Sequence, residues 1–229
     1  MCPELGTILV TGGASGLGAA VSAAIIEAGG KAIVLDRAQP DHDVDFELVD
    51  LADGRAAEDA VARVAARNQR LDGVVTCAGT DSCGKLGDVA RDDWERVVRV
   101  NLLGTVAVVR AALPELKRAR GHVVTVASTL GLRAMSEATA YCASKFGVVG
   151  FTRALAAELA GDVGVTLLVP GGMQTRFFDD RDERYKPPAG AMLNRPQDVA
   201  RAVLFALAQP AGCEVRELVI TPSTETSWP

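Results

Sequence analysis

Tyr141 and Lys145 are the two residues whose types and spacing point most directly to chemistry in this sequence. They lie four residues apart in Tyr-Cys-Ala-Ser-Lys, near the start of a helix predicted over residues 139–160, so both side chains should project from one helix face. An ammonium beside a phenol favours the phenolate, and we therefore expect the pKa of Tyr141 to fall below its ordinary value of ~10. Such a tyrosine could act as a general acid or base near neutral pH.

Ser128 lies 13 residues before Tyr141, directly after a strand predicted over residues 122–127. Open α/β folds bind ligands at the carboxyl edge of the sheet, so Ser128 should face the same site. A Tyr-x-x-x-Lys spacing alone often arises by chance, with a half-buried tyrosine beside a solvated lysine. Its position after a glycine loop, an acidic strand end and a strand-terminal serine favours catalysis instead.

A glycine-rich segment lies between a strand predicted over residues 7–11 and a helix predicted over residues 15–28. Its candidate phosphate-binding residues are Gly12, Ser15, Gly16, Leu17 and Gly18. Gly12 allows a tight turn, Gly16 lets the backbone approach a pyrophosphate, and Gly18 lets helix and strand pack closely. The first helical turn then offers free N–H groups to the phosphates. Taken alone, the segment is explained equally well as a structural turn.

An acidic residue ends the second predicted strand, over residues 31–36. Asp36 lies 18 residues beyond Gly18, where its carboxylate could accept hydrogen bonds from adenosine ribose hydroxyls and repel a 2′-phosphate. Asp36 could also be a simple strand terminator, and Arg37 could bind that phosphate. Because the glycine loop carries no basic residue, the sequence favours NAD over NADP.

Strand and helix signals alternate along the whole chain. Strands are predicted over residues 7–11, 31–36, 45–49, 73–76, 122–127, 163–169 and 218–220, and helices over 15–28, 53–67, 92–120, 139–160 and 195–208. This alternation implies right-handed βαβ units, and so a doubly wound parallel α/β sheet of the Rossmann type. No repeat or linker divides the chain, which predicts a single domain over residues 1–229. We expect residues 221–229 to form a surface tail or an oligomer contact.

Composition narrows the function classes. The 229 residues carry a net charge of −5, which disfavours a nucleic-acid partner, and 48% are hydrophobic but only 4% aromatic, so Ala, Val, Leu and Ile should form the core. No run of 18 apolar residues and no signal-peptide pattern occurs, so we expect a soluble, cytoplasmic protein without a membrane partner. Five cysteines without a Cys-x-x-Cys pair, and only two histidines, predict reduced thiols and no metal site. His122 shows no evident partner.

Together these features resemble the short-chain dehydrogenase/reductase family, in its single-domain branch with the glycine pattern Thr-Gly-x-x-x-Gly-x-Gly. The resemblance covers residues 7–220 approximately. It implies that Asn101 completes a tetrad with Ser128, Tyr141 and Lys145. It also implies further cofactor contacts, which are Asp50 and Leu51 at the adenine, Cys77, Ala78 and Gly79 after the fourth strand, and Pro170, Gly171, Met173 and Thr175 at the nicotinamide.

Two positions depart from the family pattern. Cys77 stands where the family usually has Asn, which removes an amide that bridges strands, and Met173 stands where Val or Ile is usual. The first change could loosen the adenosine pocket, and the second could reshape the nicotinamide side because Met is longer and more flexible.

The resemblance implies hydride exchange between a nicotinamide and an alcohol or ketone, with Tyr141 exchanging the proton, Ser128 polarising the substrate oxygen and Lys145 binding the nicotinamide ribose. Asn101 would position a water that links Lys145 to solvent. Two alternatives stay open, an NADPH-dependent 3-oxoacyl-thioester reductase acting on acyl carrier protein and a non-catalytic nicotinamide-binding sensor or scaffold. Family members commonly form homodimers or homotetramers.

A substrate lid is implied at residues 172–195, where Phe177, Phe178 and Tyr185 could close over an apolar group. Acidic residues in this segment alternate with arginines, which favours a solvated mixed-charge loop over a metal site.

Overall fold

A seven-stranded parallel sheet forms the centre of the computed structural model, which describes residues 5–210 and 212–228. The strands are β1 (Thr7–Thr11), β2 (Lys31–Asp36), β3 (Asp45–Leu48), β4 (Gly73–Thr76), β5 (His122–Val126), β6 (Gly164–Pro170) and β7 (Glu217–Ile220). Their order in the sheet is β3-β2-β1-β4-β5-β6-β7, and every pair is parallel. The predicted doubly wound α/β sheet is therefore confirmed.

Apolar, mostly β-branched runs form the central strands because both faces of the sheet are covered. In β1, Leu9 lies in register with Ile33 of β2 and Val74 of β4, and all three side chains are fully buried. The predicted strand bounds hold to within one residue. β3 ends one residue earlier than predicted, at Leu48, and β6 extends one residue further, to Pro170.

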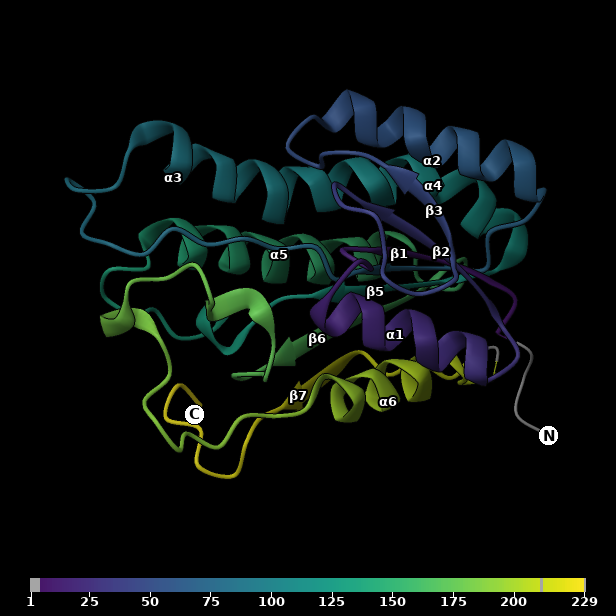
Figure 1. Cartoon of the computed structure of the whole chain (residues 1–229). Helices are drawn as coiled ribbons and strands as arrows, with labels where there is room; N and C mark the ends of the chain where they lie inside the picture. Colours follow the sequence, from purple (N-terminus) through teal and green to yellow (C-terminus); the bar gives the residue numbers. More distant parts are fainter. Residues whose placement is uncertain (1–4, 211, 229) are drawn as a thin grey trace.

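Helices cover both faces of the sheet (Figure 1). α1 (Gly16–Glu27) and α6 (Pro196–Leu207) pack side by side on one face, whereas α2 (Gly54–Asn68), α4 (Thr105–Ala119) and α5 (Thr139–Glu158) cover the other. The loops that lead from each strand into the next helix lie at the carboxyl edge of the sheet. Short 3₁₀ turns follow β5 and β6, at Thr129–Gly131, Arg176–Phe178 and Glu183–Tyr185.

The long helix predicted over residues 92–120 is interrupted. α3 (Arg91–Val98) leads into a π-helical segment, η1 (Arg99–Gly104), before α4 begins. Asn101 lies in η1 and is 1% exposed. Because a π-turn adds a residue to the helical repeat, it rotates the residues that follow, and such turns recur at functional sites. The uniform helical pattern of the sequence carries no clear signal for this interruption.

Within the continuous helical run Arg91–Ala119, an 18-residue window reaches a mean hydropathy of 1.5, which is apolar enough to qualify by composition as a membrane span. Within it, Ala107, Val108, Ala112 and Leu116 are buried in the core against the sheet and α2. Core packing therefore accounts for the apolar character of this run.

The core contains the residue types that composition predicts. Among residues 5–210 and 212–228, the buried hydrophobic side chains are Ala, Val, Leu and Ile, with the addition of Cys142. They form one cluster between the sheet and α2, α4 and α5, a second between the sheet and α1 and α6, and a smaller third between β6 and α5. Small and branched side chains let helices lie close to a flat, buried sheet.

The last described residues, up to residue 228, do not form a free surface tail, which corrects that expectation for residues 221–229, whereas the alternative of an oligomer contact stays a prediction. Pro229 lies outside the described residues. Ser227 is buried, and its hydroxyl oxygen lies 2.7 Å from that of Thr129, directly after β5. The backbone N–H of Gly172 donates to Glu225 at 3.0 Å. Sequence polarity suggested exposure, but these polar side chains find partners at the sheet edge.

Leu116→Ala tests the packing of α4. Leu116 is fully buried, so truncation leaves a cavity, and we expect the free energy of unfolding to fall by about 2–5 kcal/mol. Chemical denaturation monitored by circular dichroism measures the change. Leu86→Ala is the matched control because Leu86 is 65% exposed, and it should change stability by less than about 0.5 kcal/mol. Equal losses in the two variants would contradict the assigned core.

Candidate active site

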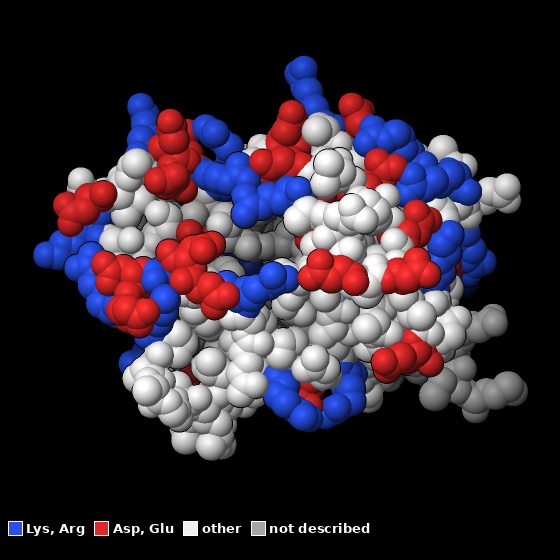
Figure 2. All heavy atoms as spheres, viewed as in Figure 1, with Lys and Arg blue, Asp and Glu red and all other residues white. Residues whose placement is uncertain are grey.

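A cavity of about 1190 Å³ lies along the carboxyl edge of the sheet. It is lined by segments that follow β1, β2, β4, β5 and β6, by the lid and by the C-terminal residues Thr224 to Ser227. Figure 2 shows acidic and basic side chains interspersed on the face in view. The cavity reaches from the glycine loop to Tyr141. Every site residue predicted from the sequence except Asn101 lines it.

The glycine loop has the close backbone packing that its spacing predicts. Gly12 has a φ of +71°, and a Cβ there would lie 2.7 Å from the backbone nitrogen of Ala78. A Cβ on Gly18 would lie 2.2 Å from the carbonyl oxygen of Gly12, so helix α1 can approach β1 only with glycine at this position. These contacts hold the first turn of α1 against the end of β1.

The N-terminus of α1 has the properties of an anion site. Ser15 is the N-cap residue, but its side chain makes no capping hydrogen bond, and the first turn contains no acidic residue. The first-turn N–H groups and the positive end of the helix dipole are therefore free for an anion. Gly16 has a φ of +55° and no side chain, so its backbone is accessible to a ligand at this point. The cradle fits the pyrophosphate of a dinucleotide.

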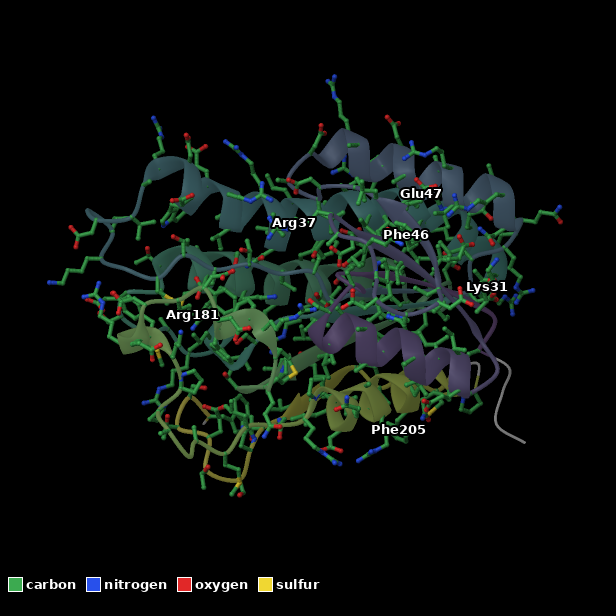
Figure 3. All side chains as sticks on the ribbon, in the orientation of Figure 1. Lys31, Arg37, Phe46, Glu47, Arg181 and Phe205 are labelled. Carbon is green, nitrogen blue, oxygen red and sulfur yellow. The ribbon has the colours of Figure 1, made fainter. Side chains whose placement is uncertain are left out.

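Asp36 lies at the end of β2, where its two carboxylate oxygens accept hydrogen bonds from Ala14 N at 2.9 Å and Ala38 N at 3.0 Å. The backbone thus fixes the carboxylate beside the glycine loop while each oxygen keeps further acceptor capacity. Arg37, labelled in Figure 3, is exposed on the rim of the same cavity. Both groups that bear on the choice between NAD and NADP therefore lie at one end of the cavity.

The predicted adenine contacts follow β3. Asp50 accepts hydrogen bonds from Ala52 N at 3.0 Å and from the Arg96 guanidinium at 2.9 Å, and Leu51 is buried beside it. Burial acts to raise the pKa of Asp50, but these hydrogen bonds outweigh it and hold the pKa below its usual range. Asp50 is therefore an ionised, braced residue in the cavity wall.

The segment Cys77 to Gly79 stays ordered without the family's usual Asn. The hydroxyl of Thr11 accepts a hydrogen bond from Ala78 N at 3.1 Å, which ties the end of β4 to the end of β1. Burial raises the pKa of the Cys77 thiol to about 12, so the thiol stays protonated and packs as an apolar group. Thr11 thus supplies one polar connection between these two strand ends, and the loosening of the adenosine pocket stays a prediction.

The segment from Pro170 to Thr175 continues from β6 along the cavity. Gly171 N donates to Ile220 O at 2.9 Å, and Met173 forms an isolated bridge with Asn194. A Cβ on Gly16 would lie 3.4 Å from the Thr175 side chain, so this segment contacts the glycine loop. Residues predicted for the two ends of a nicotinamide dinucleotide therefore border one continuous cavity.

Tyr141 and Ser128 meet as the sequence predicts, but the pKa expectation for Tyr141 is wrong for the protein alone. Burial raises the pKa of Tyr141 to about 12, the nearby Asp81 carboxylate also raises it, and a hydrogen bond with Ser128 and the Arg181 cation only partly oppose this. The expectation failed because it counted the Lys145 charge and omitted desolvation.

Lys145 is 4% exposed, and its ammonium donates to Val126 O at 2.9 Å. Nζ lies 5.6 Å from the centre of the Tyr141 ring. Burial lowers the pKa of Lys145 to about 8. A Cβ on Gly79 would lie 3.8 Å from Nζ, so this glycine leaves space beside the ammonium. The buried lysine has unused donors for a ligand hydroxyl.

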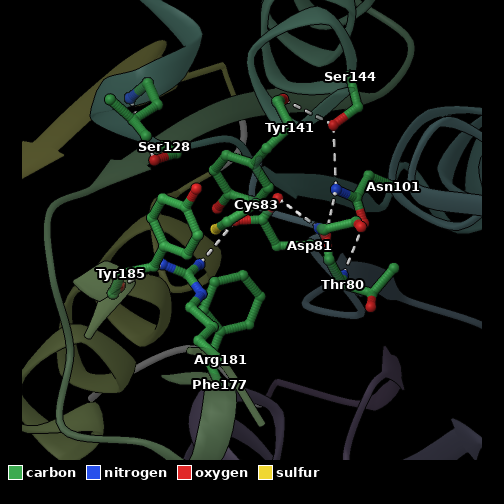
Figure 4. Close-up of polar contacts among 12 residues, drawn as sticks. Thr80, Asp81, Cys83, Asn101, Ser128, Tyr141, Ser144, Phe177, Arg181 and Tyr185 are labelled. Atoms are coloured by element: carbon green, nitrogen blue, oxygen red, sulfur yellow. Dashed lines mark hydrogen bonds and ion pairs between the residues drawn. The ribbon is translucent and has the colours of Figure 1, made fainter. Parts of the chain in front are cut away.

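Asn101 organises backbone beside the cavity rather than lining it (Figure 4). Its amide exchanges two hydrogen bonds with the backbone of Thr80, at 2.8 and 2.9 Å, and donates to Ser144 at 3.0 Å. Ser144 in turn donates to the carbonyl of Tyr141 at 2.8 Å. The side chain of Asn101 thus connects the loop after β4 to the catalytic face of α5.

The lid is fastened by an ion pair that sequence reasoning missed. Arg181 donates to the Asp81 carboxylate at 2.8 Å, with side-chain exposures of 18% and 5%. Its guanidinium carbon lies 4.8 Å from the ring centre of Phe177 (Figure 4) and 4.7 Å from that of Phe178. Phe177 packs on Tyr141 at 5.8 Å between ring centres, so this lid residue lies against the tyrosine. The only sequence signal was a lone arginine between two aspartates, 100 residues from its partner.

His122 lies at the opposite end of β5 and has a partner, contrary to expectation. Its Nε2 lies 2.7 Å from the Thr166 hydroxyl, and burial lowers its pKa. Cys77, Cys83, Cys142 and Cys213 are free thiols, and Cys2 lies outside the described residues. Within residues 5–210 and 212–228, no group of three His, Cys, Asp or Glu side chains is placed to hold a metal ion.

Comparisons with known proteins agree with this geometry. The profile of the short chain dehydrogenase family matches residues 6–186. An uncharacterized oxidoreductase of Staphylococcus aureus (strain MW2) is 31% identical over 226 residues, which cover 93% of this chain and 96% of that protein. The solved structures of the Thermoplasma acidophilum aldohexose dehydrogenase and a Thermococcus sibiricus alcohol dehydrogenase, the latter bound to 5-hydroxy-NADP, share the fold at TM-scores of 0.85 and 0.83. Each is 23% identical, and they cover 96% and 93% of this chain and 95% and 94% of their own.

Asp81→Ala tests the lid attachment. Removing the carboxylate leaves the Arg181 cation without its ion-pair partner, so the lid should detach more often, and trypsin should cut after Arg184 about tenfold faster. Mass spectrometry of timed digests measures the rate. Asp180→Ala is the control, because Asp180 is an exposed lid carboxylate. Unchanged cleavage in Asp81→Ala would show that the ion pair does not hold the lid.

Proposed function

This chain belongs to the short-chain dehydrogenase family, whose members are oxidoreductases that bind nicotinamide cofactors, and on that premise we propose that it transfers a hydride between NAD(H) and an alcohol or ketone. One observation carries the proposal. Tyr141, Ser128 and Lys145 converge on the cavity that also contains the glycine loop. The substrate is therefore a small molecule held between Tyr141 and the lid.

The residues around the cavity fit a nicotinamide dinucleotide. Its phosphates would lie on the N-terminus of α1, its adenosine between Asp36 and Leu51, and its nicotinamide along Pro170 to Thr175. When bound, such a cofactor accepts or supplies the hydride. The protein provides orientation, a site with little water and a proton donor.

Tyr141 is the proposed proton donor and acceptor at the substrate oxygen. A pKa of about 12 in the protein alone keeps the phenol protonated, which suits proton donation to a carbonyl. Acting as a base requires a cation near the phenol. Lys145 Nζ lies 5.6 Å from the centre of its ring, and the Arg181 charge acts to lower its pKa. Ser128, already hydrogen-bonded to Tyr141, would hold the substrate oxygen at the same point.

Lys145 and Asn101 have supporting roles in this proposal. The unused N–H groups of Lys145 would bind the nicotinamide ribose, beside Gly79. The side chain of Asn101 is committed to Thr80 and Ser144, so it acts as a positioning residue for the loop and for α5. Asn101 Oδ1 keeps a second acceptor position for the proposed water, and a Cβ on Gly79 would lie 3.6 Å from this oxygen and 3.8 Å from Lys145 Nζ.

We extend the proposal to a cytoplasmic homodimer or homotetramer. Leu103 in η1 and Phe146 in α5 are large exposed apolar residues on neighbouring helices, which would suit contact with a second copy.

Tyr141→Phe removes only the hydroxyl, so we expect turnover to fall by at least about 100-fold while NADH affinity changes by less than about threefold. Steady-state rates with an alcohol and ketone panel, together with NADH fluorescence titration, measure both. Full activity in this variant would sink the assignment of Tyr141. Tight NADH binding by the unaltered protein without turnover of any panel member would instead favour the sensor or scaffold alternative.

Asp36→Ala tests the cofactor preference. Removing the carboxylate abolishes its repulsion of a 2′-phosphate and leaves Arg37 to attract it, so the ratio of NADPH to NADH affinity should rise by at least about tenfold. Asp50→Ala is the comparison variant, since Asp50 is braced by Arg96 and should shift the ratio less. A preference of the unaltered protein for NADPH would overturn the NAD assignment and favour the 3-oxoacyl-thioester reductase alternative, which Arg37 could support.

A further inference from the structure

The C-terminal residues form a strap, here residues 222–227, that returns from β7 to the cavity. Figure 1 shows the yellow segment after β7 turning toward the green lid rather than away from the sheet. β7 itself ends at Ile220, whose carbonyl accepts hydrogen bonds from Gly171 N at 2.9 Å and Asn194 Nδ2 at 3.1 Å. The strap therefore begins next to the segment predicted to contact the nicotinamide.

Glu225 in the strap holds that segment directly. Its Oε2 accepts a hydrogen bond from Gly172 N at 3.0 Å. A Cβ on Gly171 would lie 2.5 Å from the same oxygen, so glycine at this position makes room for the carboxylate. The strap and the Pro170 to Thr175 segment are thus fitted to one another.

The other oxygen of Glu225 connects to the loop after β5. Oε1 accepts from Ser227 N at 3.1 Å and from the Ser227 hydroxyl at 2.8 Å, and that hydroxyl lies 2.7 Å from the Thr129 hydroxyl. A hydroxyl has one proton, so Ser227 can donate to Glu225 and also bond Thr129 only if Thr129 supplies the second proton. Thr129 is buried and directly follows Ser128.

Further bonds fix the strap in this position. Arg133 donates to Thr226 O at 3.1 Å, so three consecutive residues of the strap are tied to the body of the protein. Burial acts to raise the pKa of Glu225, but hydrogen bonds from Gly172 and Ser227 outweigh it, and the pKa lies below its usual range. Glu225 is therefore an ionised acceptor with donors on both sides.

We propose that Glu225 is a positioning residue that couples the nicotinamide side of the site, through Gly172, to the Ser128 loop, through Ser227 and Thr129. The inference rests on the proposed function. Hydride transfer requires the nicotinamide and the substrate oxygen to be held together within a fraction of an ångström, and these two loops hold them separately. A single carboxylate bonded to both fixes their separation.

Three variants separate the two connections. Glu225→Ala removes both. Glu225→Gln keeps the Gly172 bond only with its amide oxygen facing Gly172 N. Its amide N–H then faces Ser227 N, donor against donor, and only the rotatable Ser227 hydroxyl can accept from it, so the second connection is weakened. Ser227→Ala keeps the Gly172 bond and removes the link to Thr129. Glu217→Gln is the matched control, because Glu217 is a carboxylate in β7 that pairs with Arg153 on the surface.

Hydrogen exchange, ligand binding and turnover are measured for each variant. In Glu225→Ala, exchange of the Gly172 amide should accelerate by at least about tenfold, while that of Gly171, which is bonded to Ile220, changes little. NADH affinity should fall about tenfold, while affinity for ADP-ribose, which lacks the nicotinamide, stays within about twofold. Ser227→Ala should lower kcat and leave NADH affinity unchanged. Glu225→Gln should lie between the two.

Two results would overturn the proposal. One is unchanged Gly172 exchange in Glu225→Ala, and the other is an equal loss of NADH and ADP-ribose affinity, which indicates general destabilisation. Absence of NADH binding or of turnover in the unaltered protein would contradict the proposed function, whereas the exchange result still decides whether Glu225 holds the segment.

Discussion

The parallel pairing of the strands is the constraint on which the rest of this structure depends. Because β1, β4, β5 and β6 run in one direction, each connection must return across a face of the sheet as a helix, and all the strands end at the same edge. Residues far apart in the chain, such as Gly12, Ser128 and Pro170, therefore line one cavity. Burial of both faces by aliphatic helices gives that edge a rigid base. The glycines of the first loop then let α1 pack close enough to present its N-terminus.

Desolvation dominates the electrostatics of the cavity. It raises the pKa of Tyr141 and lowers that of Lys145, so burial favours the uncharged form of both side chains. The ion pair between Arg181 and Asp81 lies close enough to act on Tyr141 in both directions, and its arginine also supports Phe177 over the phenol. The lid thus contributes both apolar wall and electric charge to the surroundings of the Tyr141 phenol.

Much of this arrangement could be predicted from the sequence, because it depends on local patterns. Apolar β-branched runs predict the strands, and the glycine spacing predicts the loop before α1. The position of Tyr141 four residues before Lys145 predicts that both lie on one helix face. Contacts between distant polar residues could not be predicted in this way. Asp81 and Arg181, or Glu225 and Gly172, have no periodic signal, and the π-helical turn at Asn101 lies within an unbroken helical pattern. The spacing of Tyr141 and Lys145 predicts a lowered pKa for the phenol, but burial raises it. Burial is a property of the folded cavity and cannot be derived from sequence spacing.

Titration of the Tyr141 phenol is the most direct test of the central claim that this residue exchanges the proton at a nicotinamide site. The chain has two tyrosines, so ultraviolet difference spectra of a Tyr185→Phe variant report Tyr141 by itself. In the protein alone, the Tyr141 phenol should titrate with a pKa of about 12. Saturation with NAD⁺ should lower that pKa by at least about two units, because a cationic ring then lies beside the phenol. The same pKa with and without NAD⁺ would contradict the account.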